Sequence, residues 1–119
     1  MGKVLQVRVS ASTFDPDRVK KRWPQLYGLA FGDEPPGPSR GVLELAHTLA
    51  DKKRLGMLPR DTEGLFEGLD RALGLAESLE AALADWKPAR ANELSEALEE
   101  HLDELEIAEV LRTIDTMRN

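Results

Sequence analysis

The stretch GLFEGLDRALGLAESLEAALADWKP, residues 64–88, contains the most regular apolar pattern in the chain. Its apolar side chains lie alternately four and three residues apart, at Leu65, Leu69, Ala72, Ala76, Leu79, Leu83 and Trp86. This spacing is typical of a helix that packs lengthwise against another helix, as in a coiled coil. A small residue also stands at every fourth position from Gly64 to Ala76, which predicts that the neighbouring helix approaches closely.

Further helices are expected on both sides of this stretch. Lys87-Pro88 ends the helix and begins a last one, so the two should form an antiparallel hairpin with a very short connection. Before residue 64, a 3.6-residue apolar spacing predicts a helix of about fifteen residues that starts near Arg40 and fades in the basic run 52–54. The predicted fold class is therefore mainly α, an antiparallel helical bundle of about three longer helices.

Residues 1–38 are expected to differ from the helical bundle at 39–119, although both belong to a single domain, 1–119. Residues 3–10 alternate in polarity, with Leu5 and Val7 on one side, and this period of two predicts one short N-terminal β-strand. Asp15-Pro16-Asp17 is typical of a helix start, so a short aromatic helix is expected from Pro16 to Trp23. Pro24 then interrupts this helix or starts a further turn that ends at Gly28 or Gly32. Residues 32–38 contain three prolines and should form a stiff loop.

The last helix carries two apolar faces in succession. Leu94, Leu98, Leu102 and Leu105 fall on one side of it, whereas Ile107, Val110, Ile114 and Met117 fall on nearly the opposite side. No glycine or proline lies between them to let the helix turn over. The second face must therefore be covered by the N-terminal part of the chain or by another copy of it.

The single expected strand poses a related problem, because a strand without a partner leaves its backbone hydrogen-bonding groups unpaired. It could pair with a short segment around residues 54–58, with its counterpart in a second subunit, or with another protein. Both features favour association between chains. The predicted contact residues are Leu5, Val7, Ile107, Val110, Ile114 and Met117.

Composition excludes several classes of protein. The 119 residues contain no cysteine, which excludes disulfides, thiolate nucleophiles and cysteine-based metal sites. No apolar run is long enough to span a bilayer, and residues 1–6 lack the apolar core of a signal peptide. We therefore expect a cytoplasmic protein without a membrane partner.

The net charge of −6 is unevenly distributed. Residues 1–31 carry +4 and residues 61–119 carry −11, and eight carboxylates with no lysine or arginine lie between Glu93 and Glu109. This acidic stretch is expected to be a solvated helix face or to lie near the basic cluster Arg18–Arg22 of the same or a neighbouring chain. A basic protein partner is the remaining interpretation. Because an acidic surface repels phosphate, nucleic-acid binding is not expected from this half of the chain.

Two motifs offer alternative functions. Glu44 and His47 match the Glu-x-x-His element of metal-binding helical bundles, but that architecture needs a second pair, and Leu98 occupies the corresponding position before His101. A small metal-dependent enzyme is therefore one alternative, with Glu44 and His47 as weak candidate ligands. No other catalytic or cofactor-binding motif is found, so no cofactor is expected.

The second alternative is a nucleic-acid-associated module. Four aromatic residues lie within eighteen positions, at Phe14, Trp23, Tyr27 and Phe31, beside the basic cluster Arg18–Arg22. Interleaved rings and cations can bind single-stranded nucleic acid, but the same rings serve equally well in a core or a subunit interface. The favoured function is a non-catalytic protein-interaction or assembly protein that self-associates, most simply as a two-fold dimer.

Overall fold

The computed structural model describes residues 5–7, 11–13 and 17–118. The chain is mainly helical, in agreement with the prediction from the apolar spacing. The elements in order are β1 (Leu5–Val7), β2 (Ala11–Thr13), α1 (Asp17–Arg22), α2 (Pro24–Phe31), the short 3-10 helix η1 (Pro38–Arg40), α3 (Val42–Arg54), the 3-10 helix η2 (Arg60–Leu65), α4 (Phe66–Ala84) and α5 (Pro88–Arg118). No described helix is both long enough and apolar enough to cross a bilayer.

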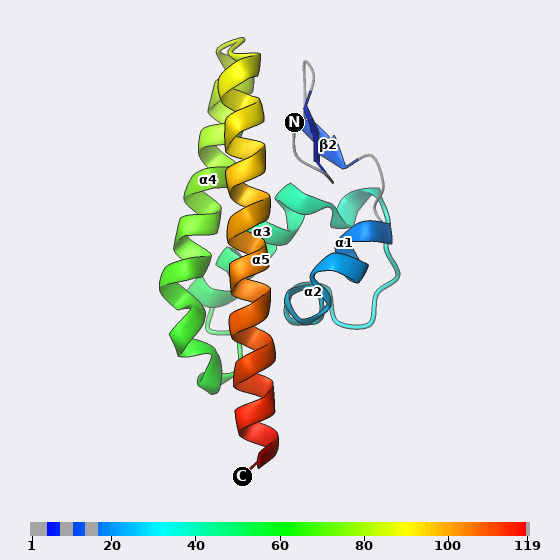
Figure 1. Cartoon of the computed structure of the whole chain (residues 1–119), viewed down its shortest axis with the longest axis vertical. Helices are drawn as coiled ribbons and strands as arrows, with labels where there is room; N and C mark the ends of the chain where they lie inside the picture. The colour runs from blue at the N-terminus through cyan, green and yellow to red at the C-terminus, as the bar shows by residue number, and fades with distance from the viewer. Residues whose placement is uncertain (1–4, 8–10, 14–16, 119) are drawn as a thin grey trace.

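Helices α4 and α5 lie side by side and run in opposite directions (Figure 1). The alternating spacing of α4 places Leu69, Ala72, Ala76 and Leu79 in the buried contact. The contact surface on α5 is its leucine face, which is buried at Leu94, Leu98, Leu102 and Leu105. The small residues allow close approach, because a side chain on Gly68 would collide with Leu105 of α5. α4 and α5 are the two longest helices of the described chain.

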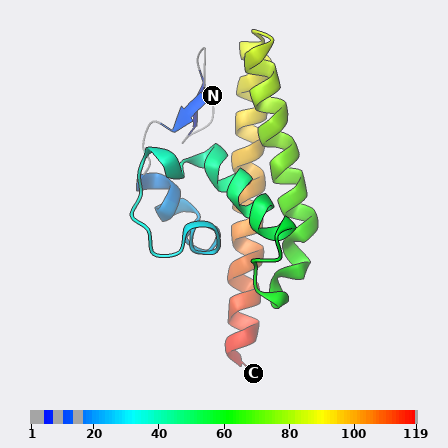
Figure 2. The same ribbon diagram turned by 180° about the vertical axis from the view of Figure 1, so that it is seen from behind.

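Helix α3 runs obliquely across the α4–α5 pair, as the view from behind shows (Figure 2). Its buried residues Leu45, Ala46 and Leu49 join the same apolar core as the leucines of α5. α1 and α2 lie on the other side of α3 and also contact α5. The N-terminal helices are therefore packed against the long pair through one continuous core.

The short aromatic helix is followed by a second helix, in agreement with the alternative in which Pro24 starts a further helical segment. α1 ends at Arg22, and α2 begins at Pro24 and continues to Phe31. Proline suits the first position of a helix because its missing N–H would have no partner there. Gly32 ends α2 in the left-handed region, with φ of 63°, and donates its N–H to Gly28 O. Trp23 and Tyr27 are fully buried, so both rings are part of the core.

The prediction of one continuous N-terminal strand over residues 3–10 is not supported. The described strand β1 covers only Leu5–Val7, and it pairs antiparallel with β2 in the register Leu5↔Thr13. β2 is short and carries serine and threonine, so it lacks the apolar alternation from which strands are predicted. Residues 3, 4 and 8–10 lie outside the described part of the chain. Pairing with β2 removes the argument that β1 needs a strand from another subunit.

The close approach of α4 and α5 predicts opposite effects for two glycines of α4. Gly68→Ala should lower the free energy of unfolding by about 1–2 kcal/mol, because the new methyl overlaps Leu105 in a packed contact. Gly74→Ala should raise it by about 0.5–1 kcal/mol, because open space surrounds Gly74 and alanine favours a helix interior. Urea unfolding of both variants measures the difference. Equal stabilisation by both would show that Leu105 moves aside freely.

Candidate functional site

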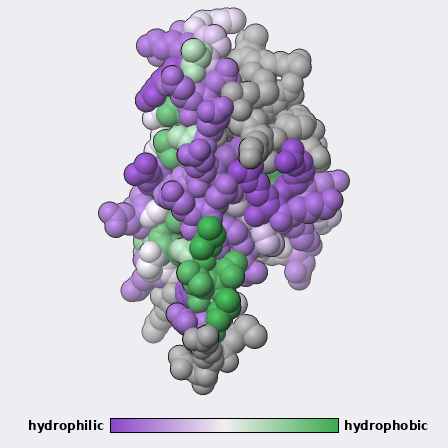
Figure 3. Space-filling view, in the orientation of Figure 1, coloured by the Kyte–Doolittle hydropathy of each residue, from purple (hydrophilic) through white to green (hydrophobic). Residues whose placement is uncertain are grey.

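The second apolar face predicted for the last helix is exposed in the structure. Ile107, Val110, Leu111 and Ile114 of α5 expose 62%, 38%, 57% and 44% of their surfaces. We call these four residues the α5 stripe. They form a continuous apolar band on the front of the lower part of α5 (Figure 3). Of the other predicted contact residues, Leu5, Val7 and Met117 have side chains outside the described part of the structure.

The opposite side of the same helical turns is polar and buried. Beyond Leu105, Glu106 and Glu109 expose only 8% and 2% of their surfaces. Glu106 faces α2, and Glu109 pairs with Arg112 of its own helix. α5 therefore reverses the usual arrangement over these turns, with carboxylates inside and apolar side chains outside. Buried charges need partners, so the contacts of these carboxylates explain the reversal.

Glu106 acts as a helix cap for α2 across a large sequence separation. Its Oε1 accepts a hydrogen bond from the backbone N–H of Leu26 at 3.0 Å. The backbone N–H of Gln25 donates to both carboxylate oxygens of Glu106, at 3.1 Å each. These N–H groups belong to the first turn of α2, where a helix has no internal acceptors. Burial raises the pKa of Glu106, and the two backbone hydrogen bonds and the nearby Glu109 modify this shift in opposite directions.

One turn earlier, α5 holds the junction between α1 and α2. Arg22 donates to both carboxylate oxygens of Asp103, at 2.9 and 2.8 Å, and to Glu99 at 3.0 Å. The indole N–H of the buried Trp23 donates to Asp103 at 2.8 Å. The hydrogen bonds to Asp103 are the main cause that raises the pKa of Arg22. Part of the acidic stretch thus lies beside the basic cluster of the same chain, one of the two arrangements expected from sequence.

These contacts fix the rotation of α5 about its own axis. Glu99, Asp103 and Glu106 are spaced by four and three residues, so they share one face of the helix. All three bind α1 or α2. Rolling the helix to bury the α5 stripe would withdraw these carboxylates from their partners, which is costly for buried charges. The stripe is therefore held outward by the polar contacts on the other side.

The predicted metal ligands are not brought together with further ligands. His47 Nε2 lies 2.6 Å from Glu80 Oε1 of α4, and His101 Nε2 lies 2.7 Å from the backbone oxygen of Gly68. Among the described residues, no group of three histidine or carboxylate side chains has the arrangement of a metal site. Both histidines instead connect α4 to its neighbouring helices.

Two of the rings proposed for base stacking are not accessible. Trp23 and Tyr27 are fully buried, and Phe31 packs edge-on against Tyr27 with ring centroids 5.0 Å apart. Phe14 lies outside the described residues. Arg22 is occupied by Asp103 and Glu99, so Arg22 and Trp23 serve the contact of α1 and α2 with α5.

Comparisons with known proteins give no independent indication of function. No protein-family model matches the chain, and neither the curated proteins nor the solved structures include a significantly similar one. The site must be interpreted from its own geometry.

The buried Glu106 cap predicts a pH-dependent difference between two variants. Glu106→Gln keeps Oε1 as acceptor for both N–H groups, whereas Glu106→Ala leaves them without it and should cost about 1–2 kcal/mol. Because folding raises the pKa of this carboxyl, the stability that its protonated form contributes is lost as pH rises through that raised pKa. Relative to wild type, Glu106→Gln should therefore become more stable from about pH 4 to about pH 7.

Urea unfolding across this pH range measures the effect, with Glu106→Ala as the variant that loses the acceptor. Parallel pH curves for wild type and Glu106→Gln would show that ionisation of Glu106 is not coupled to folding.

Proposed function

We propose that this protein is a non-catalytic assembly protein that self-associates through the α5 stripe. The observation that carries the proposal is the exposure of four neighbouring apolar side chains on a helix whose rotation is fixed by carboxylates on its other side. A contiguous exposed apolar patch typically marks a protein contact. Full burial of a single large aliphatic side chain contributes about 1.5–3 kcal/mol, so covering the exposed parts of four is a substantial driving force.

The spacing of the stripe favours another helix as its partner. Ile107, Leu111 and Ile114 lie four and three residues apart, and Val110 lies beside them, as in the seam of a coiled coil. An identical helix presents the same spacing, so two copies can bury their stripes against each other. A contact in which both partners use the same surface closes as a two-fold dimer.

The charges on this face favour an antiparallel arrangement of the two helices. Glu100 and Glu104 are exposed, and they continue the row of the stripe toward the start of α5 with the same four-three spacing. In a parallel pair these carboxylates would face their own copies, and like charges at close range repel. In an antiparallel pair the stripes overlap while the acidic rows extend past each other.

Replacement of Ile114 by aspartate tests the interface. Ile114→Asp should weaken self-association at least about tenfold, because each dimer would place two charges in an apolar contact. Helical content should be retained, since this side chain is 44% exposed. Analytical ultracentrifugation measures the association, and circular dichroism measures the helicity.

Met57→Asp is the matched control, because it adds the same charge at a side chain that is 62% exposed and lies outside α5. An equal loss of association in this control would assign the effect to net charge. Wild-type protein that stays monomeric at micromolar concentration would contradict the proposed function.

The orientation can be tested by disulfide formation, because the natural chain contains no cysteine. Leu111→Cys should cross-link two copies, since this position lies near the two-fold axis in an antiparallel pair. Glu104→Cys should not, because antiparallel helices centred on residue 111 would hold the two positions about 20 Å apart, far beyond disulfide reach. Efficient cross-linking of Glu104→Cys under mild oxidation would identify a parallel pair.

A further inference from the structure

Trp86, in the turn between α4 and α5, has an unusual backbone conformation. Its φ of 56° lies in the left-handed region, and it is the only described residue other than glycine with positive φ. Its N–H donates to Leu83 O at 3.1 Å, and the N–H of Lys87 donates to Ala82 O at 2.8 Å. This pair of bonds is the Schellman motif, whose left-handed position is usually glycine. A bulky side chain at this position is strained.

The side chain of Trp86 makes no described contact that would compensate for this strain. It is 75% exposed, and in the described part of the chain it takes part in no ring contact, cation–π contact or side-chain hydrogen bond. A residue held at an energetic cost, without a compensating contact in its own chain, points to a role outside it. Tryptophan is among the residues most enriched at the energetic centres of protein interfaces.

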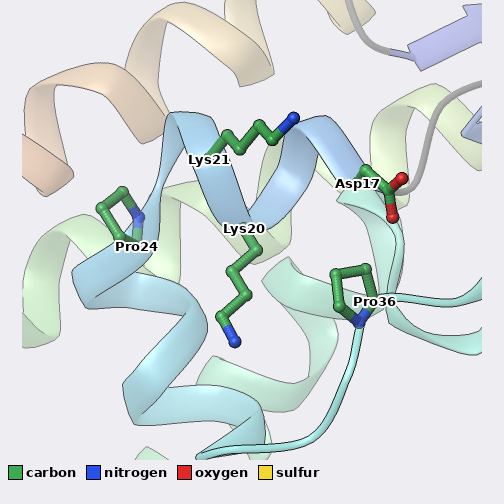
Figure 4. A pocket seen from close by; sticks show the side chains of 5 residues that line it. All are labelled: Asp17, Lys20, Lys21, Pro24 and Pro36. Carbon is green, nitrogen blue, oxygen red and sulfur yellow. The ribbon is translucent and has the colours of Figure 1, made fainter.

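A pocket of complementary chemistry lies elsewhere on the molecule. It has a volume of about 380 Å³ and is lined by Asp17, Lys20, Lys21, Pro24 and Pro36. The two lysines extend from α1, and the two proline rings lie on either side of Lys20 (Figure 4). The Lys20 ammonium lies 5.6 Å from the centre of the Tyr27 ring, so Lys20 already makes one cation–π contact. We call this site the proline pocket.

The chemistry of the proline pocket suits an indole. Tryptophan is the preferred ring for cation–π contacts with lysine, and the proline rings supply apolar walls. Asp85, exposed and next to Trp86, adds a carboxylate that can pair with a lysine of the pocket. Trp86 does not fill the pocket of its own chain, because the α4–α5 turn lies at one end of the helix pair, whereas α1 lies beside the middle of α5 (Figures 1 and 2).

We propose that Trp86 of one copy inserts into the proline pocket of a second copy. This contact extends the self-association proposed above but uses neither partner's α5 stripe. Since it joins two different surfaces, it is a head-to-tail contact that does not compete with stripe pairing. The two contacts together would build assemblies larger than a dimer.

Stability separates a binding role of Trp86 from a structural one. In the Ile114→Asp background, which removes stripe pairing, Trp86→Gly should raise the urea midpoint of unfolding, because glycine relieves the left-handed strain. Measurement at low concentration keeps the protein monomeric. A lower midpoint would show that Trp86 supports its own fold and would overturn the proposal.

Complementation tests the contact itself. In the same background, Trp86→Gly lacks the inserted ring but keeps the proline pocket, whereas Lys20→Glu/Lys21→Glu keeps the ring and reverses the charge of the pocket. Neither variant should associate alone, but an equimolar mixture should, because one complete contact is restored. Sedimentation velocity of each protein and of the mixture measures this result.

Arg54→Glu/Arg71→Glu is the matched control, since it makes the same charge change at two exposed arginines outside the pocket. This control should associate alone in the Ile114→Asp background. A mixture that stays monomeric, or a pocket variant that associates as strongly as this control, would overturn the proposed contact. If Ile114→Asp does not weaken association, the proposed pairing of stripes fails. The Trp86 contact is tested separately, by the complementation experiment.

Discussion

The structure depends on the carboxylates of α5 that contact α1 and α2, of which Glu99 and Glu106 are buried. Asp103 holds Arg22 and Trp23 together at the junction of the two helices, and Glu106 caps the first turn of α2. Hydrogen bonds to charged groups are stronger than neutral ones, and removal of one partner leaves a buried charge uncompensated. These contacts therefore orient α5 more strictly than its leucine face could alone, because apolar packing is not directional.

The parts of the fold that were predicted from sequence are those with local periodicity. The four-three spacing of α4 and the leucine row of α5 each depend on residues within one helix, so one sequence is enough to find them. The same reasoning found the second apolar face at Ile107, Val110 and Ile114, which is exposed in the structure. Charge distribution along the sequence also indicated the basic cluster Arg18–Arg22 as one possible neighbour of the acidic stretch, and Arg22 does contact Glu99 and Asp103.

The features that sequence reasoning missed depend on residues far apart in the chain. The start of α2 at Trp23-Pro24 has no serine, threonine, aspartate or asparagine to cap it, and this lack is a signal that the acceptor must come from elsewhere. Which of eight carboxylates supplies it cannot be read from spacing. β2 was missed because three small or polar residues carry no strand pattern. The left-handed conformation of Trp86 was missed because tryptophan is rarely found there.

Trp86 and the α5 stripe, both exposed, lie toward opposite ends of α5. Trp86 immediately precedes the helix, and the α5 stripe starts nineteen residues after Pro88, which is about 28 Å along the axis. At that separation, contacts made by one should not alter contacts made by the other. The residues of the α4–α5 turn are exposed, and the buried side of α5 beside the stripe is occupied by Glu106 and Glu109. Glu106 is explained by the cap that it supplies to α2, whereas glycine in the turn would relieve the left-handed strain that Trp86 carries, so Trp86 is the residue of these two that the fold of a single chain leaves unexplained.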